Sequence, residues 1–312
     1  MKTEPVFLEH DGGIDDLLSL LLILTMDNKS LIGVNVTPAD CFIEPALEST
    51  YKILQLFRRE DIPIGRCDFN GVNAFPSEWR ARPEVVNALP MLINLPDPPD
   101  PYSHPDATDL LIAKISESPD PVSIIITGPC SNVVRALNKA PSIRDNIQKI
   151  VWMGGAFRTP GNVQTYQHNG SAEWNVFWDP ESARQLFEME LPLVCIPLDV
   201  TNHVPVNKAF LSRLAMQSNY EISNLAGQFW AMTIDTIPSY HYVYFMWDVL
   251  ATSYLDIPEE FTVSEVRAKV SVRPPNAGQT YLDKEGNQLK IATEVNKEVF
   301  YEYILNKFKI SI

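Results

Sequence analysis

Short apolar runs typical of buried strands alternate with helical patterns through the first two thirds of the chain. The segment Ser123–Thr127 reads Ser-Ile-Ile-Ile-Thr, and such continuous β-branched runs are typical of strands that are buried on both faces. The alternation predicts βαβ units with right-handed crossovers, and therefore a parallel sheet. The expected strands are Val6–Glu9, Leu31–Val36, Pro63–Gly65, Ser123–Thr127, Ile150–Met153 and Leu193–Leu198. The expected helices are Asp15–Met26, Glu44–Phe57, Ala107–Glu117, Ser131–Lys139 and Pro180–Glu188.

The last third of the chain has a different pattern. Asn207 to Leu255 looks helical, and Phe261 to Ile291 looks like short strands. We see no internal repeat and no clear second domain, and 312 residues can form one large α/β domain. We therefore expect a single domain over residues 1–312, with an open, mostly parallel, Rossmann-like sheet flanked by helices.

The carboxyl ends of the strands are the expected location of a site. In open α/β sheets, ligands bind in the crevice beyond these ends. The segments that follow successive strand ends are Asp11, Thr37–Asp40, Thr127–Pro129, Gly154–Gly155 and Asp199. We expect these segments to line one rim of the sheet.

Four carboxylates lie within eight residues at the first strand end: Glu9, Asp11, Asp15 and Asp16. So many like charges repel one another, and a helix N-terminus offsets only ~0.3–1 kcal/mol per charge. A hard divalent cation offsets far more, and oxygen-only ligands indicate Ca²⁺ or Mg²⁺. The alternative is that one aspartate caps the helix while the other acids are solvated. A cap needs only one acid, so the pattern favours a metal site.

Composition argues against two classes of partner. A net charge of −14 and a pI near 4.8 argue against binding to nucleic acid or to an anionic membrane.

The cysteines and the apolar segments indicate where the protein is located. Cys41, Cys67, Cys130 and Cys195 are dispersed, which indicates reduced thiols and not a disulfide framework. The apolar stretch Leu17–Met26 is too short to span a bilayer, and no signal peptide is apparent. We expect a soluble, cytoplasmic protein.

Four motifs occur in order along the chain: EHDGGIDD, ITGPCSNVVRAL, the run MGGAF…GNV…SAEWNVFWDPESA, and FMWDVLA. Together they resemble the motifs of the inosine–uridine-preferring nucleoside hydrolase family, whose opening signature is D-x-D-x-x-x-D-D. The resemblance covers most of the chain. It implies an enzyme that hydrolyses the N-glycosidic bond of ribonucleosides to ribose and free base, using Ca²⁺ on an open α/β sheet.

The resemblance also assigns roles to residues of this chain. Its implied Ca²⁺ ligands are Asp11, Asp16, Asp248 and the backbone carbonyl of Thr127. Asp11 is also the implied general base, which takes a proton from a metal-bound water. The implied substrate-binding residues are Asp15, Asp40, Met153, Asn162, Glu173, Asn175 and Trp247. A small-molecule ribonucleoside is the implied partner, and a homo-oligomer, either a dimer or a tetramer, is expected.

The chemistry supports this assignment independently of the family. The C1′–N bond of a nucleoside breaks through a transition state with oxocarbenium character. Carboxylates stabilise the developing positive charge, and a bound divalent cation orders those acids and acidifies a water molecule. A single displacement by that water would invert the anomeric centre.

The chain departs from the family pattern at three positions. Glu9 replaces the first aspartate, and we expect its longer side chain to disturb the acid cluster. Asp40 replaces an asparagine, so it cannot donate an amide hydrogen bond, and it would raise a carboxyl pKa near Asp11. Trp247 replaces a histidine that helps the leaving group in the inosine–uridine branch. A tryptophan there is similar to the purine-preferring branch, and stacking favours purine nucleosides, although plain core packing is the alternative.

Several candidates have structural alternatives. Glu173 and Asn175, at positions i and i+2, would share one face of an extended segment, from which both could bind the sugar. The alternative is a structural role in a strand or at a helix cap. The structural alternative for Asn162 is a turn residue, and for Asp248 it is the N-cap of a helix. The alternative for Met153 is a side chain of the apolar core. Asp179 is expected to cap a helix, and structural or surface roles are expected for His10, His168, His203 and His241. Phe75 and Trp79 lie in a loop that could close over a base.

Two other functions are compatible with parts of the pattern. A family member with impaired catalysis that binds ribosides is suggested by Glu9 and Asp40. A phosphatase with an aspartate nucleophile would also place acids at a strand end. The phosphatase requires an aspartate where this chain has Glu9, and no phosphate-cradling loop is present in the sequence.

Overall fold

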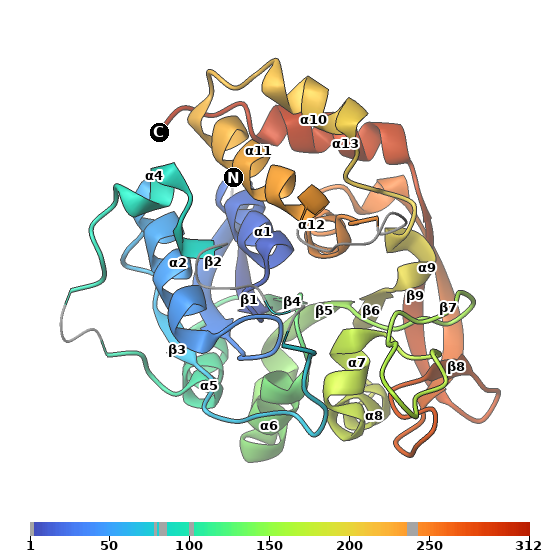
Figure 1. Ribbon diagram of the computed structural model, residues 1–312. Coiled ribbons are helices and arrows are strands. Elements are labelled where there is room, and N and C mark those ends of the chain that lie inside the picture. The colour runs from blue at the N-terminus through green and yellow to red at the C-terminus, as the bar shows by residue number, and fades with distance from the viewer. Residues whose placement is uncertain (1–2, 78–79, 81–85, 100–102, 236–242) are drawn as a thin grey trace.

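A single sheet with strand order β3-β2-β1-β4-β5-β6-β9-β7-β8 organises the chain (Figure 1). The structure is a computed structural model that describes residues 3–77, 80, 86–99, 103–235 and 243–312. The strands are β1 Glu4–His10, β2 Lys29–Val36, β3 Ile64–Arg66, β4 Val122–Ile126, β5 Ile147–Met153, β6 Leu193–Ile196, β7 Phe261–Val270, β8 Thr280–Leu282 and β9 Asn287–Val295.

Strands β1 to β6 pair in parallel, and β9 is parallel to β6. Only the last part of the sheet is antiparallel, where β7 pairs with β9 and β8. The expected open, mostly parallel sheet is therefore confirmed, and so are the six expected strands, whose ends agree to within three residues. Leu198 is an exception, because it begins a short helix and does not extend β6. The preceding Pro197 has no N–H to donate to the ladder, and β6 ends at Ile196.

Helices flank the sheet on both faces (Figure 1). One face is covered by α1, α11 and α12, and the other by α5, α6 and α8. The helices are α1 Ile14–Leu24, α2 Ile43–Leu56, α4 Pro90–Ile93, α5 Ala107–Glu117, α6 Ser131–Lys139, α7 Trp174–Trp178, α8 Pro180–Glu188, α9 Leu198–Thr201, α10 Lys208–Ala215, α11 Glu221–Asp235, α12 Trp247–Ser253 and α13 Lys297–Lys307. The five expected helices are confirmed.

The sheet separates two apolar cores. Successive side chains of a strand point to opposite faces, so Val6 and Leu8 of β1 join the core under α1, while Phe7 joins the core under α5 and α6. In β5, Met153 likewise joins the core under α1, and Trp152 joins the core under α5 and α6. Burial on both faces explains why these strands are almost continuously apolar.

The order of the strands reverses at β1. The chain goes from β1 to β2 and β3 on one side, and returns to β4 on the other side of β1. A crevice forms at such a switch point, beyond the carboxyl ends of the strands. Asp11 and Thr127 follow β1 and β4 directly, and the Thr127 N–H donates to the Glu9 carbonyl at 2.8 Å. The fold therefore brings the expected rim residues of these two strands together.

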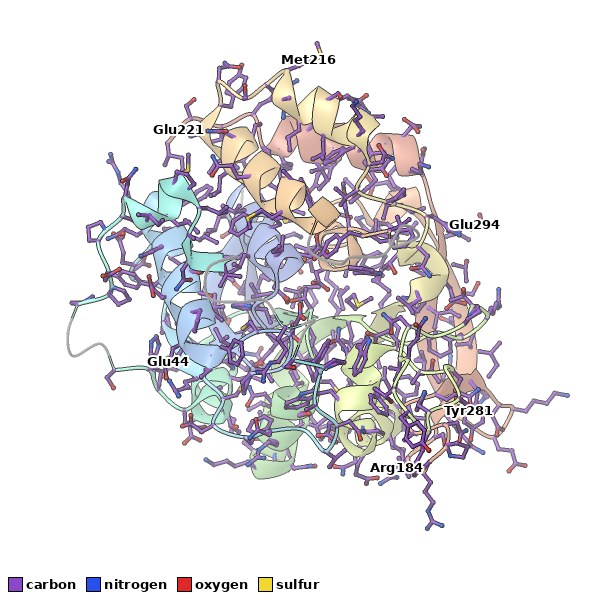
Figure 2. All side chains as sticks on the ribbon, in the orientation of Figure 1. Glu44, Arg184, Met216, Glu221, Tyr281 and Glu294 are labelled. Atoms are coloured by element: carbon purple, nitrogen blue, oxygen red, sulfur yellow. The ribbon has the colours of Figure 1, made fainter. Side chains whose placement is uncertain are left out.

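Charged side chains lie at the periphery of the molecule, as Glu44, Arg184, Glu221 and Glu294 illustrate in Figure 2. Arg184 pairs with two glutamates of its own helix, which contributes little to stability at an exposed site. All four cysteines are buried and free. Among the helices of the described residues, none combines the length and apolar character needed to cross a membrane.

Candidate active site

The turn between β1 and α1 places three aspartates at the switch point. Asp16, in the first turn of α1, folds back so that its Oδ2 accepts the Gly13 N–H at 2.9 Å. Its Oδ1 accepts the Asp11 N–H at 3.3 Å. Gly12 has a φ of 79°, and a Cβ there would lie 2.3 Å from the Cys41 Sγ. Only glycine satisfies both the backbone conformation and the close approach.

Thr127 connects this turn to β4. Its Oγ1 donates to Asp16 Oδ1 at 2.5 Å, which orients the Asp16 carboxylate. The Thr127 carbonyl accepts the Asn175 Nδ2 at 2.8 Å, and the same amide group donates to the Met153 carbonyl at 3.1 Å. Asp16, Thr127, Asn175 and Met153 are therefore brought together, as their proposed common site requires.

Asp15 joins α1 to α12. Its Oδ2 accepts the backbone N–H groups of Asp248 and Val249, at 2.6 Å and 3.2 Å. Asp15 therefore satisfies the first turn of α12, where backbone donors have no partner in their own helix. Its Oδ1 is buried and has no hydrogen-bond partner among the described residues, so it can accept from a ligand. Asp248 is the second residue of α12 behind Met246 as N-cap, so the interpretation of Asp248 as the cap is wrong.

Asp40 contacts the expected base through its backbone. Its N–H donates to Asp11 Oδ2 at 3.1 Å, so the main chain supplies a donor even though the side chain is not an amide. Its carboxylate lies against Gly13, where a Cβ would be only 2.2 Å from Asp40 Oδ2. Asp40 is thus partly buried at the same N-terminus of α1 as Asp11 and Asp16.

The pKa values of Asp11, Asp15, Asp40 and Asp248 are raised in this cluster. Burial, followed by the neighbouring charges of Asp16 and Asp40, raises the pKa of Asp11 well above its usual range. Burial and the other acids have the same effect on the pKa values of Asp40 and Asp248. Burial also raises the pKa of Asp15 to about 7, although the two N–H groups of α12 oppose the shift. The positive charge of a cation at this position would oppose these shifts, because it favours the ionised form of each neighbouring carboxyl group.

The carboxylates of Asp11, Asp15, Asp16 and Asp248 and the Thr127 carbonyl are oxygen donors, which suit a hard divalent cation. Among the described residues, Asp15 Oδ1 has no hydrogen-bond partner. The side chains are not already arranged around a metal position, however. Within the described part of the chain, no group of three or more His, Cys, Asp or Glu side chains is arranged to hold a metal ion. Asp16 is instead occupied by Gly13, Asp11 and Thr127.

Comparison with known proteins identifies the family. A model of the inosine-uridine preferring nucleoside hydrolases matches residues 6–302. The chain belongs to this family. A curated relative, the pyrimidine-specific ribonucleoside hydrolase RihA of Shewanella woodyi, is 29% identical over 296 residues, which are 91% of this chain and 89% of the relative. The chain is therefore an enzyme that hydrolyses ribonucleosides.

Solved structures have the same fold. The inosine-uridine preferring nucleoside hydrolase of Bacillus anthracis has a TM-score of 0.90 and 34% identity, over 98% of this chain and 99% of that one. A purine-preferring ribonucleoside hydrolase of Gardnerella vaginalis has a TM-score of 0.82 at 23% identity, over 98% of each chain. The second comparison shows a likeness of fold alone.

In this nucleoside hydrolase, Glu173 caps a helix that the sequence did not predict. Glu173 Oε1 accepts the Asn175 N–H at 2.8 Å, and Oε2 accepts those of Gly155 and Val176 at 3.1 Å and 3.2 Å. The expected extended segment is wrong, because residues 174–178 form α7. Burial raises the pKa of Glu173 to about 7, despite these N–H donors.

Asn162 and Met153 support the same helix. Asn162 Oδ1 accepts the Trp174 N–H at 3.1 Å, so this side chain fixes the start of α7. Met153 is buried in the core, and its Sδ lies 3.4 Å from Asn175 Nδ2. Asp179 caps α8 as expected, because its Oδ1 accepts the Ser182 N–H at 3.1 Å.

Glu9 does not disturb the acid cluster, and that expectation is wrong. Glu9 shares the sheet face of Phe7, away from α1, where its Oε1 accepts the Asn35 and Asn132 amides at 2.7 Å and 2.9 Å. Burial raises the pKa of Glu9 to about 8, although both amides oppose this. The alternation of side chains along β1 explains the separation, because Glu9 and His10 point to opposite faces.

Aromatic side chains lie beside the acids. Trp247 packs edge-on against Tyr244 and Phe245, with ring centroids 4.7 Å and 5.8 Å away, and its Nε1 has no hydrogen-bond partner among the described residues. Phe75 stacks on Trp174 of α7 at 4.9 Å. Trp79 lies outside the described residues.

The histidines have structural or surface positions, where they are described. His10 is buried and accepts the Gly12 N–H at 3.1 Å, and His168 accepts the Gly170 N–H at 3.0 Å. Both therefore have partners that the sequence did not reveal. His203 is exposed, and His241 lies outside the described residues.

Arg80 was missed by the sequence analysis. It brings a positive charge to the turn that carries Asp40, where its Nη2 donates to the Cys41 carbonyl at 2.6 Å. No motif marks this arginine, and the only signal is a basic residue in a loop that follows β3.

Proposed function

We propose that this chain is a Ca²⁺-dependent ribonucleoside hydrolase in which Asp11 is the general base, and that it prefers purine nucleosides. The observation that carries the proposal is the cluster of Asp11, Asp15, Asp16 and Asp248, all buried at the switch point of the sheet. The proposed Ca²⁺ ligands are Asp11, Asp16, Asp248 and the Thr127 carbonyl. Bound there, Ca²⁺ would order these acids and make a water molecule more acidic.

Asp11 is suited to accept a proton from the attacking water. Its Oδ2 is held by the Asp40 N–H, and burial favours its protonated form, so it has a high affinity for a proton. The water oxygen bonds to C1′ while the C1′–N bond breaks, and the bonding electron pair leaves with the base. Attack from the face opposite the base inverts the anomeric centre. The remaining carboxylates stabilise the positive charge that develops on the ribose.

The sugar hydroxyls would be held by side chains on two elements. Asp15 Oδ1, which has no hydrogen-bond partner in the described part of the chain, could accept a ribose hydroxyl, while Oδ2 remains on α12. Asn175 uses its amide N–H groups on two carbonyls, which leaves its Oδ1 for the substrate. Glu173 and Asn162 would complete the grip from the start of α7. We propose that Met153 packs against the sugar.

The base preference rests on Trp247. The indole adjoins Asp248 and is only partly buried, so one side of the ring can stack on a base. A purine offers a larger face for stacking than a pyrimidine, and contact with an indole makes its ring nitrogens easier to protonate as the base departs. The name of the RihA relative specifies pyrimidines, so the preference is open to a direct test.

Wider properties of the enzyme are proposals as well. We propose that residues 1–312 act as one catalytic domain and assemble as a dimer or tetramer. Four buried free cysteines support a reducing, cytoplasmic setting.

A reducing-sugar assay on inosine, adenosine, guanosine, uridine and cytidine tests the substrate class. We expect ribose release from each, with higher kcat/KM for the purine nucleosides. Higher kcat/KM for uridine and cytidine would overturn the purine preference. No release from any of them would overturn the hydrolase and favour riboside binding without turnover.

A further inference from the structure

We propose that Arg80 is a positioning residue that clamps the turn of residues 37–42 and offsets the extra negative charge of Asp40. In this view Asp40 and Arg80 act as a pair in the place of the neutral amide that the family pattern has at position 40. The inference rests on the proposed function, because it concerns the same base and the same cation.

The contacts of Arg80 converge on one turn. Its Nη2 donates to the carbonyls of Cys41 and Pro38, at 2.6 Å and 3.3 Å, and these two residues flank Asp40. Its guanidinium carbon lies 4.6 Å from the centre of the Phe42 ring. One guanidinium nitrogen donates to both carbonyls while the planar guanidinium lies over the aromatic ring, and the compact ammonium of lysine has no such plane to stack on the ring. Arg80 therefore holds the backbone on both sides of Asp40.

The turn that Arg80 holds fixes the proposed base. The Asp40 N–H donates to Asp11 Oδ2, and the Asp40 carboxylate lies directly against Gly13 at the start of α1. A shift of the turn would move the donor that orients Asp11. Displacements of about 1 Å in a catalytic site can cost about 100-fold in rate.

The positive charge of Arg80 offsets the negative charge of Asp40. Asp40 adds a carboxylate to the four buried aspartates, and Arg80 Nη2 lies 2.6 Å from the carbonyl of the next residue, Cys41. Burial, followed by the charge of Asp16, raises the pKa of Asp40, and the charge of Arg80 opposes this shift. Arg80 acts in the same direction on the adjacent Cys41 thiol, whose pKa is raised by burial and then by the neighbouring acids. The substitution of aspartate for asparagine thus comes with a nearby cation that reduces its effect on the cluster.

Calcium titration of the chelated protein separates charge compensation from a purely structural clamp. We would measure the Ca²⁺ Kd of wild type, Arg80→Met, Asp40→Asn and the double variant by calorimetry. Loss of a positive charge should tighten Ca²⁺ binding about three- to tenfold, and loss of the negative charge should weaken it by a similar factor. The double variant should return to within about twofold of wild type, because the two charges cancel.

Two further variants control the titration. Arg80→Lys keeps the charge but loses the bridge and the ring contact, so we expect a Kd close to wild type and a lower kcat. Arg273→Met removes a positive charge at an exposed position, and it should leave both the Kd and kcat unchanged. Thermal unfolding of each variant reports whether the fold is intact.

Steady-state kinetics tests the positioning role. Arg80→Met should lower kcat about tenfold or more while KM changes less than about threefold, because the Asp40 N–H no longer orients Asp11 Oδ2 for proton transfer, while the Ca²⁺ ligands and the sugar contacts remain.

The results that would contradict the inference differ from those that would contradict the hydrolase. Weaker Ca²⁺ binding in Arg80→Met, or a double variant that does not return toward wild type, would overturn charge compensation. A wild-type kcat in Arg80→Met would overturn the clamp. Wild-type protein that neither binds Ca²⁺ nor releases ribose would instead overturn the proposed function itself.

Discussion

At the scale of single residues, the site depends on where each side chain is already engaged. The two oxygens of Asp15 differ, because Oδ2 accepts the N-terminus of α12 and Oδ1 has no hydrogen-bond partner within the residues that the structure describes. The side-chain amide of Asn175 donates to the Thr127 and Met153 carbonyls. These hydrogen bonds fix the orientation of the side chains proposed to bind the substrate. Substrate binding therefore costs less conformational entropy.

Replacement of the proposed base should abolish turnover and leave the fold intact. We expect Asp11→Ala to lower kcat about 1,000-fold or more, since general-base catalysis contributes up to about 10⁴-fold and Asp11 is also a proposed ligand. Ribose release measures the effect, with circular dichroism as the check of folding. Asp145→Ala, at an exposed position, is the matched control and should be fully active. Wild-type activity in Asp11→Ala would refute the assignment of the base.

Trp247 gives a prediction about specificity. Trp247→Ala should lower kcat/KM for inosine and guanosine by at least about tenfold more than for uridine and cytidine, because stacking on a larger ring is lost. Trp247→Phe keeps an aromatic face and should recover most of the purine activity. Equal losses on purines and pyrimidines would show that Trp247 only packs against Tyr244 and Phe245.

At the scale of elements, the β1–α1 turn is the most constrained part of the site. Gly12→Ala places a Cβ 2.3 Å from the Cys41 Sγ, at a backbone φ of 79°. We expect a loss of about 2–4 kcal/mol in the free energy of unfolding, from strain and overpacking together.

Gly170→Ala is a matched control for this turn. Gly170 has a φ of 80°, but the atom nearest to its Cβ position is the Val163 carbonyl oxygen at 3.9 Å. Only the backbone strain of about 1–2 kcal/mol is expected there. Urea unfolding of both variants measures the difference, and equal losses would contradict the close packing of Gly12 on Cys41.

Elements with strong local patterns were predictable, and those set by distant contacts were not. The apolar runs of β1 and β4 identified two strand ends on the rim of the sheet, and with them the positions of Asp11 and Thr127, whereas the strand order that makes this the switch point came from the structure. In contrast, α7 is only five residues long and rich in aromatic and β-branched side chains, so it has no helical period to detect. It forms because Glu173 caps it and Asn162 holds its first residue.

The same limit applies to the individual departures from the family pattern. The alternation of side chains along β1 places Glu9 on the far face, and this could have been derived from the strand itself. The partner of Asp40 could not, because Arg80 reaches the turn from a separate loop.

At the scale of the whole molecule, the buried acids link stability to pH. The pKa values of Asp15 and Glu173 are raised to about 7, and that of Glu9 to about 8. In the unfolded chain these groups lose their protons near their ordinary pKa values, around pH 4. Between about pH 4 and pH 8 the native state therefore binds more protons than the unfolded state, and stability falls as the pH rises.

Metal-free protein should accordingly have a Tm at least about 3 °C lower at pH 8 than at pH 5.5. Added Ca²⁺ should recover most of the loss at pH 8, because it binds the native cluster and reduces the repulsion. Differential scanning calorimetry with a chelator and with Ca²⁺ measures both effects, and NaCl at matched ionic strength is the control. A Tm that rises with pH in the chelated protein would contradict the burial of protonated acids.

The central claim is that a cation at the carboxylate cluster is required for ribonucleoside hydrolysis. The most direct measurement is the initial rate of ribose release from inosine, after chelation and again during back-titration with Ca²⁺. We predict no measurable rate in the chelated protein and full recovery as Ca²⁺ is restored. An unchanged rate after chelation, in protein shown to contain no residual metal, would contradict the claim.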